Sequence, residues 1–151
     1  MSFEVGNILL FRNFKLPLET KDKFFIVLDQ KEDEYTLMSM TTSKQYIHDE
    51  KLKHGMIEDG DVVVYCFMKD VLVGENGFLF RKNTFVSTRS NTHIFTEIFL
   101  AEAQVDVLDV LKQGELVNLV YCFYKSKHTP RKYKKILECV LTRILDSESS
   151  N

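Results

Sequence analysis

The chain of 151 residues suits one domain, because domains cluster around roughly 100–150 residues. Its 44% hydrophobic content is ordinary for a globular protein and excludes a wholly disordered chain. The 20 basic residues nearly balance the 22 acidic ones, and the net charge of −2 argues against a strongly basic nucleic-acid coat protein or a polybasic membrane module.

The beginning of the sequence carries Glu4 and no basic leader before an apolar run, which argues against a secretory signal. The longest apolar stretch, 62–68, is far shorter than the roughly 18–20 residues that span a bilayer. Cys66, Cys122 and Cys139 form no CxxC pair, and each lies in an apolar run, which predicts buried reduced thiols. We therefore expect a cytoplasmic protein without membrane contact.

The first two thirds of the chain are typical of strands. We expect a strand over 5–11, a polar loop around Pro17 and a buried strand over 24–28, which is rich in aromatic and β-branched residues. Alternation over 35–42 predicts a third strand, which forms a hairpin with the second across the charged turn 31–34.

The middle of the chain is less regular. Residues 44–60 are polar and predict a long loop with at most one helical turn. Further strands are expected over 61–68, 78–86 and 93–100. Between them, Glu75-Asn76-Gly77 is the clearest turn of the chain, because Asn and Gly tolerate positive φ.

The last third predicts helices. Asp106 is a suitable cap for a short helix through Leu111, which Gly114 would end. Residues 115–124 are apolar nearly all round, so both a helix and a buried strand remain open there. The segment from Tyr133 to Leu145 has one apolar stripe at helical spacing.

Thr129-Pro130 is a suitable start for that last helix, since a hydroxyl cap is followed by a proline whose missing N–H costs nothing there.

Strands followed by helices indicate an α+β fold: a small curled antiparallel sheet of five to six strands, closed by C-terminal helices. We expect a single domain over 1–145, mainly β over 5–104 and helical over 106–145, with 146–151 frayed.

The sequence contains no phosphate-binding loop, dinucleotide fingerprint, zincin motif or nucleophile elbow. His48 and His54 flank two carboxylates, but their spacing fits no metal site and favours a solvated loop. A nucleophilic role for Cys66 is disfavoured, because burial in an apolar run raises a thiol pKa. We expect neither a metal nor a cofactor.

Positive charge collects in the second half of the chain. Residues 1–75 hold 9 basic and 14 acidic residues (net −5), and residues 76–151 hold 11 and 8 (net +3). Arg131 and Lys132 fall in the first turn of the last helix, followed by Lys135, where the helix dipole disfavours cations. A bound phosphate would offset that cost and makes these residues candidates for nucleic-acid binding, with a solvated basic face as the alternative.

A second basic group consists of Arg81, Lys82 and Arg89, followed by His93. The nearby rings, if exposed, would offer a stacking surface for single-stranded nucleic acid. The alternative, that these rings are core residues of a strand, is favoured because strand phenylalanines are usually buried. The rings are those of Phe78, Phe80 and Phe85.

Four segments resemble PemK/MazF-like proteins, a toxin family with an SH3-like barrel. Residues 5–11 (VGNILLF) resemble the family's opening strand, with its Gly-Asp/Glu-Ile-Val pattern. Residues 23–29 (KFFIVLD) lie where the family has Arg-Pro before an apolar strand, and 37–43 (LMSMTTS) resemble its next strand. Residues 84–86 are similar to a later strand, so the resemblance covers 5–112 with an insertion around 44–60.

The resemblance implies an SH3-like barrel and a metal-independent endoribonuclease that cleaves single-stranded RNA, is usually a homodimer and is held by an antitoxin. It implies Thr41 or Thr42 as the hydroxyl that assists at the phosphate, beside a cation that stabilises the developing charge. Lys23 stands where the arginine is expected and Phe24 where the proline is, and a lysine cannot make the bidentate phosphate contact. Residues 115–145 extend beyond the usual family length.

Three hypotheses remain open. The chain is a PemK/MazF-like barrel with its catalytic arginine replaced that binds RNA or an antitoxin-like protein partner. Alternatively, it is an active ribonuclease that uses Thr41 or Thr42 with Lys23 or Arg81. The third is an interaction domain with no nucleic-acid role, which binds a helical partner through its apolar surfaces.

Overall fold

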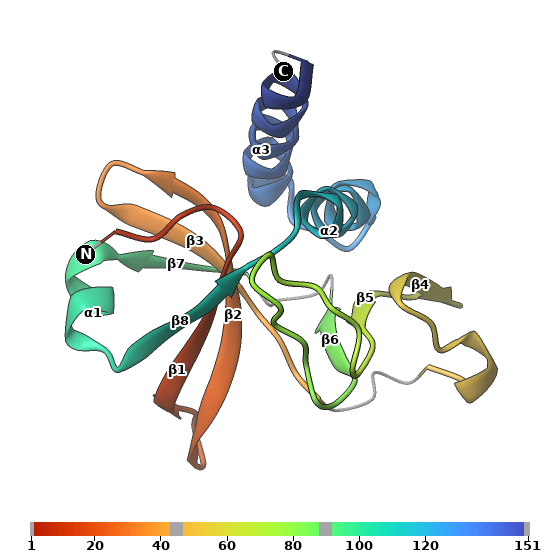
Figure 1. Ribbon diagram of the computed structural model, residues 1–151, viewed down its shortest axis with the longest axis horizontal. Coiled ribbons are helices and arrows are strands. Elements are labelled where there is room, and N and C mark those ends of the chain that lie inside the picture. Colours follow the sequence, from red (N-terminus) through yellow and green to blue (C-terminus); the bar gives the residue numbers. More distant parts are fainter. Residues whose placement is uncertain (1, 43–46, 88–91, 150–151) are drawn as a thin grey trace.

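The computed structural model describes residues 2–42, 47–87 and 92–149 and shows an α+β fold (Figure 1). One antiparallel sheet has the order β7-β3-β2-β1-β8 and a second has the order β4-β5-β6. The bounds are β1 (Asn7–Lys15), β2 (Thr20–Lys31), β3 (Glu34–Ser39), β4 (Gly55–Asp59), β5 (Val62–Phe67), β6 (Thr84–Ser87), β7 (Thr92–Thr96) and β8 (Val105–Val110).

A 3₁₀ turn, η1 (Asp49–Lys51), precedes β4, and a short helix, α1 (Glu97–Glu102), connects β7 to β8. Two longer helices, α2 (Gln113–Lys125) and α3 (Arg131–Ser149), follow the last strand. The expected curled antiparallel sheet followed by helices is thus confirmed. The described strands number eight rather than five or six, and the sheets do not close into a barrel, because β7 and β8 remain separate edges.

Both faces of the five-stranded sheet are buried. Along β2, Ile26 and Leu28 belong to one apolar cluster, and Phe25 and Val27 belong to another on the opposite face. Successive side chains of a strand point to opposite faces, so a strand buried on both sides is a continuous apolar run. This explains why 24–28 shows no alternation, and it confirms the prediction of a buried strand there.

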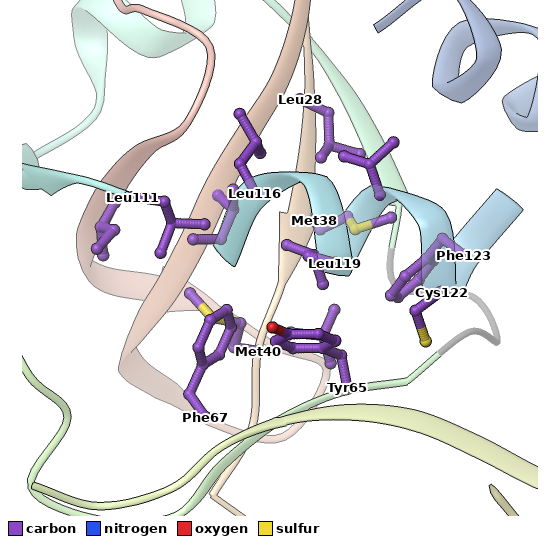
Figure 2. Packing of buried hydrophobic residues seen from close by; sticks show 14 of the residues in the cluster. Leu28, Met38, Met40, Tyr65, Phe67, Leu111, Leu116, Leu119, Cys122 and Phe123 are labelled. Carbon is purple, nitrogen blue, oxygen red and sulfur yellow. The ribbon is translucent and has the colours of Figure 1, made fainter. Parts of the chain in front are cut away.

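Helix α2 packs between the two sheets (Figure 2). Its Leu119 and Phe123 point toward Met38 of the five-stranded sheet and Tyr65 of the three-stranded one, and each of these four side chains is at most 1% exposed. The other side of α2 contacts α3, whose Leu137 and Val140 join the same cluster. A helix with neighbours on several sides is apolar nearly all round, which is why 115–124 suits either a helix or a strand.

The prediction of a short helix after Asp106 is wrong, because residues 105–110 form the strand β8. It pairs antiparallel with β1, and Asp106 forms an ion pair with Arg12 at 2.7 Å instead of capping a helix. Asp109 accepts main-chain N–H groups from Asn76 and Phe78, at 3.0 Å each, and so holds the predicted 75–77 turn against the strand. The three β-branched valines of the segment, Val105, Val107 and Val110, favour the strand.

Three other expectations need correction. The loop over 44–60 contains β4, which is polar at its exposed positions and pairs with β5. The strand predicted over 78–86 is limited to β6, since 78–83 lie in the loop before it. The strand over 93–100 ends at Thr96, whose hydroxyl accepts the N–H of Phe99 and caps α1. None of the described helices is long and apolar enough to cross a membrane.

The three cysteines differ in accessibility. Burial raises the pKa of Cys66 to about 11 and that of Cys122 to about 12, whereas Cys139 lies on the exposed side of α3. The expectation that all three thiols are buried is therefore wrong for Cys139. We expect an aromatic disulfide reagent to label one thiol rapidly in the folded protein and all three in denaturant. Rapid labelling that survives in Cys139→Ser would contradict this arrangement.

The Asp109 carboxylate predicts a pH-dependent stability. Burial acts to raise its pKa, but hydrogen bonds from the N–H groups of Val110, Asn76 and Phe78 and from the Asn76 amide bring it below its usual value. Its contribution to stability is therefore present above the unfolded pKa of about 3.9 and is lost as pH falls through the folded pKa. We expect Asp109→Asn to lower the free energy of unfolding by about 1–3 kcal/mol at pH 7.

In urea denaturation at pH 3 that loss should shrink, because pH 3 lies below the unfolded pKa of about 3.9 and the stabilising contribution of the carboxylate declines there. The control is Asp106→Asn on the same strand, where the ion pair with Arg12 is exposed to solvent and contributes little to stability. An equal loss for Asp109→Asn at both pH values would show that the carboxylate charge is not responsible.

Candidate nucleic-acid interface

The connection between α2 and α3 fixes the start of α3. The Thr129 hydroxyl donates to the carbonyl oxygen of Phe123 at 2.7 Å, so it joins the start of α3 to the end of α2. Nearby, the His128 ring donates from Nε2 to the carbonyl oxygen of Asp61 at 2.7 Å, and Lys127 pairs with the Asp61 carboxylate at 3.2 Å. Because Asp61 directly precedes β5, these bonds place the first turn of α3 beside that end of the three-stranded sheet.

Four cations occupy the first two turns of α3. Arg131, Lys132 and Lys135 are exposed and Lys134 is half-buried. None of the four forms an ion pair with any residue in the described part of the chain. The cations therefore stand where the helix dipole disfavours them, with no carboxylate to offset that cost.

Tyrosine rings lie beside basic side chains on both helices. On α2, Tyr121 is 49% exposed and Tyr124 is 36% exposed, and Lys125 Nζ lies 5.4 Å from the centre of the Tyr121 ring. On α3, Lys132 Nζ lies 4.8 Å from the centre of the Tyr133 ring. A groove of about 440 Å³ runs between the helices, lined by Tyr124, Arg131, Lys134, Lys135 and Glu138.

The sequence interpretation missed Tyr121 and Tyr124, because it treated residues 115–124 as apolar nearly all round. The signal was nevertheless present. In a helix, residues three and four apart share a face, so Tyr121, Tyr124 and Lys125 lie together. Phe123 and Val120 fall on the buried side of the same helix.

Arg81 and Lys82 are exposed but lie elsewhere on the molecule. They precede β6, whose Thr84 pairs with Phe67, whereas α3 starts near Asp61, at the other end of β5. Six residues of strand separate these ends by about 20 Å, so the two basic groups do not form one surface. Phe80 and Phe85 are each 2% exposed, which confirms them as core residues, and Arg89 lies outside the described residues.

Lys23 and Thr41, which the resemblance implies as catalytic, lie on paired, neighbouring segments of the chain. Lys23 is half-buried on β2, and Thr41 leaves β3 just after Met40, whose N–H donates to Phe24 O at 3.0 Å. The main chain of Thr41 then pairs with Phe85 of the three-stranded sheet, at 3.0 and 2.7 Å, and Thr42 is exposed.

The structure also brings His93 of β7 close to Lys23. Burial, followed by the charge of Lys23, lowers the pKa of His93, and burial, followed by Lys21, lowers the pKa of Lys23. The His93 ring lies 5.7 Å from the ring of Phe25, which shares the face of Lys23 on β2. The sequence had placed His93 with Arg81 instead, because the pairing of β7 with β3 is not visible in local spacing.

The two central histidines do not share a site. His48 bonds to Asp59 at 2.7 Å, and among the described residues no group of three or more potential ligands lies together. His54 is only 27% exposed, so the expectation that it belongs to a solvated loop is wrong.

His54 belongs to a structural network. The main-chain N–H of Met68 donates to His54 Nδ1 at 3.1 Å, so Nε2 carries the hydrogen that His54 donates to the Glu115 carboxylate. The hydroxyl of Tyr65 donates to the same carboxylate at 3.2 Å, and burial, followed by Glu115, raises the pKa of Tyr65. The network ties α2 to β4 and β5.

No protein-family model matches this chain, and neither a curated protein nor a solved structure matches it. The resemblance to PemK/MazF-like proteins therefore stays a prediction, and the surface shared by α2 and α3 is the feature from which a function can be inferred.

Proposed function

We propose that this protein is a binding module for single-stranded RNA. The contact surface is the α2–α3 face, which we define as Tyr121, Tyr124, Lys125, Arg131, Lys132, Lys134 and Lys135. The observation that carries the proposal is the presence of two exposed tyrosine rings beside cations that have no carboxylate partner among the described residues.

Phosphate groups suit the cations of this face. Arg131 and Lys132 at the start of α3 are destabilised by the dipole of their own helix, and a phosphate there would relieve that repulsion. Arginine adds a planar pair of donors that matches two phosphate oxygens, while the lysines act as mobile point charges. Glu138 is the single carboxylate in the lining of the groove, so the charge of the groove remains positive.

The tyrosines favour a single strand over a duplex. Each base of a single strand exposes a flat face, and stacking on an aromatic side chain is worth about 1–3 kcal/mol per base. The bases of a duplex already stack on one another, and the deep major groove of an RNA duplex excludes side chains. Tyr121 and Tyr124 lie one helical turn apart, a spacing that suits neighbouring bases of one strand.

We expect Arg131→Ala/Lys135→Ala to weaken binding to a fluorescent oligouridine, measured by anisotropy across a salt series. Removing two phosphate contacts should reduce the slope of log K against log salt by about 1.4, because each contact on a single strand contributes about 0.7. The matched control, Arg81→Ala/Lys82→Ala, removes two exposed cations from the other basic group and should leave the slope unchanged.

A second comparison isolates stacking from charge. Tyr121→Ala should weaken binding by about 1–3 kcal/mol, whereas Tyr121→Phe should retain it, since the ring and not the hydroxyl carries the contact. Absence of RNA binding by the wild type, or equal weakening by both double variants, would refute the assignment to this face. Binding of an acidic protein without RNA binding would favour the interaction-domain hypothesis instead.

A second candidate function is metal-independent RNA cleavage at Lys23, and one observation favours it. The Lys23 ammonium lies within electrostatic range of His93, whose lowered pKa leaves the imidazole neutral and able to accept a proton near pH 7. Lys23 would stabilise the negative charge that develops on the phosphate, and Thr41 or Thr42 would assist as the resemblance implies.

This candidate predicts cleavage of single-stranded RNA in the presence of a metal chelator, with the rate reduced at least about 100-fold in His93→Ala. Burial and Lys23 lower the pKa of His93, so the imidazole stays neutral at pH values somewhat below about 6.5, the ordinary histidine pKa. The cleavage rate should therefore hold as the pH falls below about 6.5 and should decline only at lower pH. Gel analysis of RNA incubated with wild type, Lys23→Ala and His93→Ala tests it. No cleavage by the wild type rejects the enzyme, and cleavage by Lys23→Ala removes that residue from the mechanism.

A further inference from the structure

We propose that two copies of this chain pair antiparallel through β7, about a two-fold axis at Ile94. Strand β7 is one of the two edges of the five-stranded sheet (Figure 1). Edge strands are ordinarily protected from pairing by charged residues or proline. The sequence of β7, Thr92-His93-Ile94-Phe95-Thr96, contains no proline and no Lys, Arg, Asp or Glu.

The hydrogen-bond pattern shows which main-chain groups of β7 point away from the sheet. The N–H of Glu97 donates to Asp33 O at 2.7 Å, and Thr96 is paired with Glu34 in the same register. Bonded and non-bonded pairs alternate along an antiparallel ladder. His93 and Phe95 therefore bond to β3, while Thr92 and Ile94 direct their N–H and C=O groups toward the open edge.

No hydrogen bond from another described residue reaches the outward groups of Ile94. A second β7 strand fits them. Antiparallel pairing centred on Ile94 sets Ile94 opposite its own copy, where the two residues exchange two main-chain hydrogen bonds. The same register sets Thr92 opposite Thr96 of the copy; the Thr96 N–H points outward there, while its C=O accepts the first hydrogen bond of α1.

The side chains of β7 are also complementary to their own copy. The strand is nearly symmetrical about Ile94, so each cross-strand pair is neutral: Thr with Thr, His with Phe and Ile with Ile. Pairs of β-branched residues and pairs of threonines stabilise antiparallel strands. Ile94 is 46% exposed and Ile98, at the start of α1, is 72% exposed, so apolar area is available beside the axis.

The other edge strand does not offer the same fit. Strand β8 exposes Val107 to 51%, but it carries Asp106 and Asp109. Antiparallel self-pairing about its centre would set Asp106 opposite Asp109 of the copy, and like charges directly opposite are destabilising. The partner strand therefore belongs at β7, and the dimer would have one continuous sheet of ten strands.

Sedimentation velocity of the full chain tests the proposal. The wild type should sediment with twice the chain mass, and Ile94→Lys should sediment as a monomer, because it places two ammonium groups opposite each other at the axis. Val107→Lys is the matched control at the other edge, with a similarly exposed parent side chain, and should remain dimeric. A monomeric wild type at all concentrations, or a dimer that Ile94→Lys leaves intact, would overturn the proposal.

A cross-link provides a readout that does not depend on the lysine variant folding. Residues in a bonded antiparallel pair have Cα atoms about 5.5 Å apart, within disulfide range. Ile94→Cys, placed in Cys139→Ser to remove the exposed native thiol, should form a disulfide-linked dimer on mild oxidation. Val107→Cys in the same background should remain unlinked. Absence of the link at position 94, or equal linking at 107, rejects pairing through β7.

Discussion

The fold depends on burying α2 between two sheets that share little backbone pairing. Short bridges such as Thr41 with Phe85 join the sheets, while the side chains of α2 fill the space between them. Leu119, Val120 and Phe123 are at most 1% exposed, and burial of each stabilises the fold by about 1.5–3 kcal/mol. Glu115 fixes the orientation of α2, because its carboxylate accepts hydrogen bonds from Tyr65 of the smaller sheet and from His54, which directly precedes β4.

The buried side of α2 determines its exposed side. Once Leu119 and Phe123 point into the core, helix geometry leaves Tyr121, Tyr124 and Lys125 to solvent, and Tyr124 lines a groove with the first turns of α3. These side chains project from packed helices, so less conformational entropy is lost on binding than from a loop. Residues 1–75 carry a net charge of −5, so the proposed RNA contact depends on the local positive charge of this face and not on the net charge of the chain.

The local sequence pattern predicted the elements whose buried side chains follow one regular spacing. The apolar run of β2, its hairpin with β3 and the one-sided stripe of α3 each follow from a single periodicity. Strand β8 could not be separated from a short helix, because Asp106 suits a helix cap as well as an edge ion pair with Arg12. Strand β4 was missed because only two of its five residues, Met56 and Ile57, are apolar, and the segment becomes a strand only by pairing with β5.

The candidate sites were also predicted only in part, because tertiary structure brings their side chains together. Arg131, Lys132 and Lys135 were visible as a charge excess, but the tyrosines beside them required knowledge of which side of α2 is buried. Lys23 and His93 are 70 positions apart, and only the order β7-β3-β2 brings them together. Register across three strands is a long-range property that spacing within one segment does not carry.

The most direct test of the central claim is NMR titration of the isotope-labelled protein with a short single-stranded RNA. Binding at the α2–α3 face predicts amide shift changes that concentrate on 121–125 and 131–135 and disappear in high salt. Shift changes confined to the strands around Lys23, or none at any RNA concentration, would contradict RNA recognition by this face.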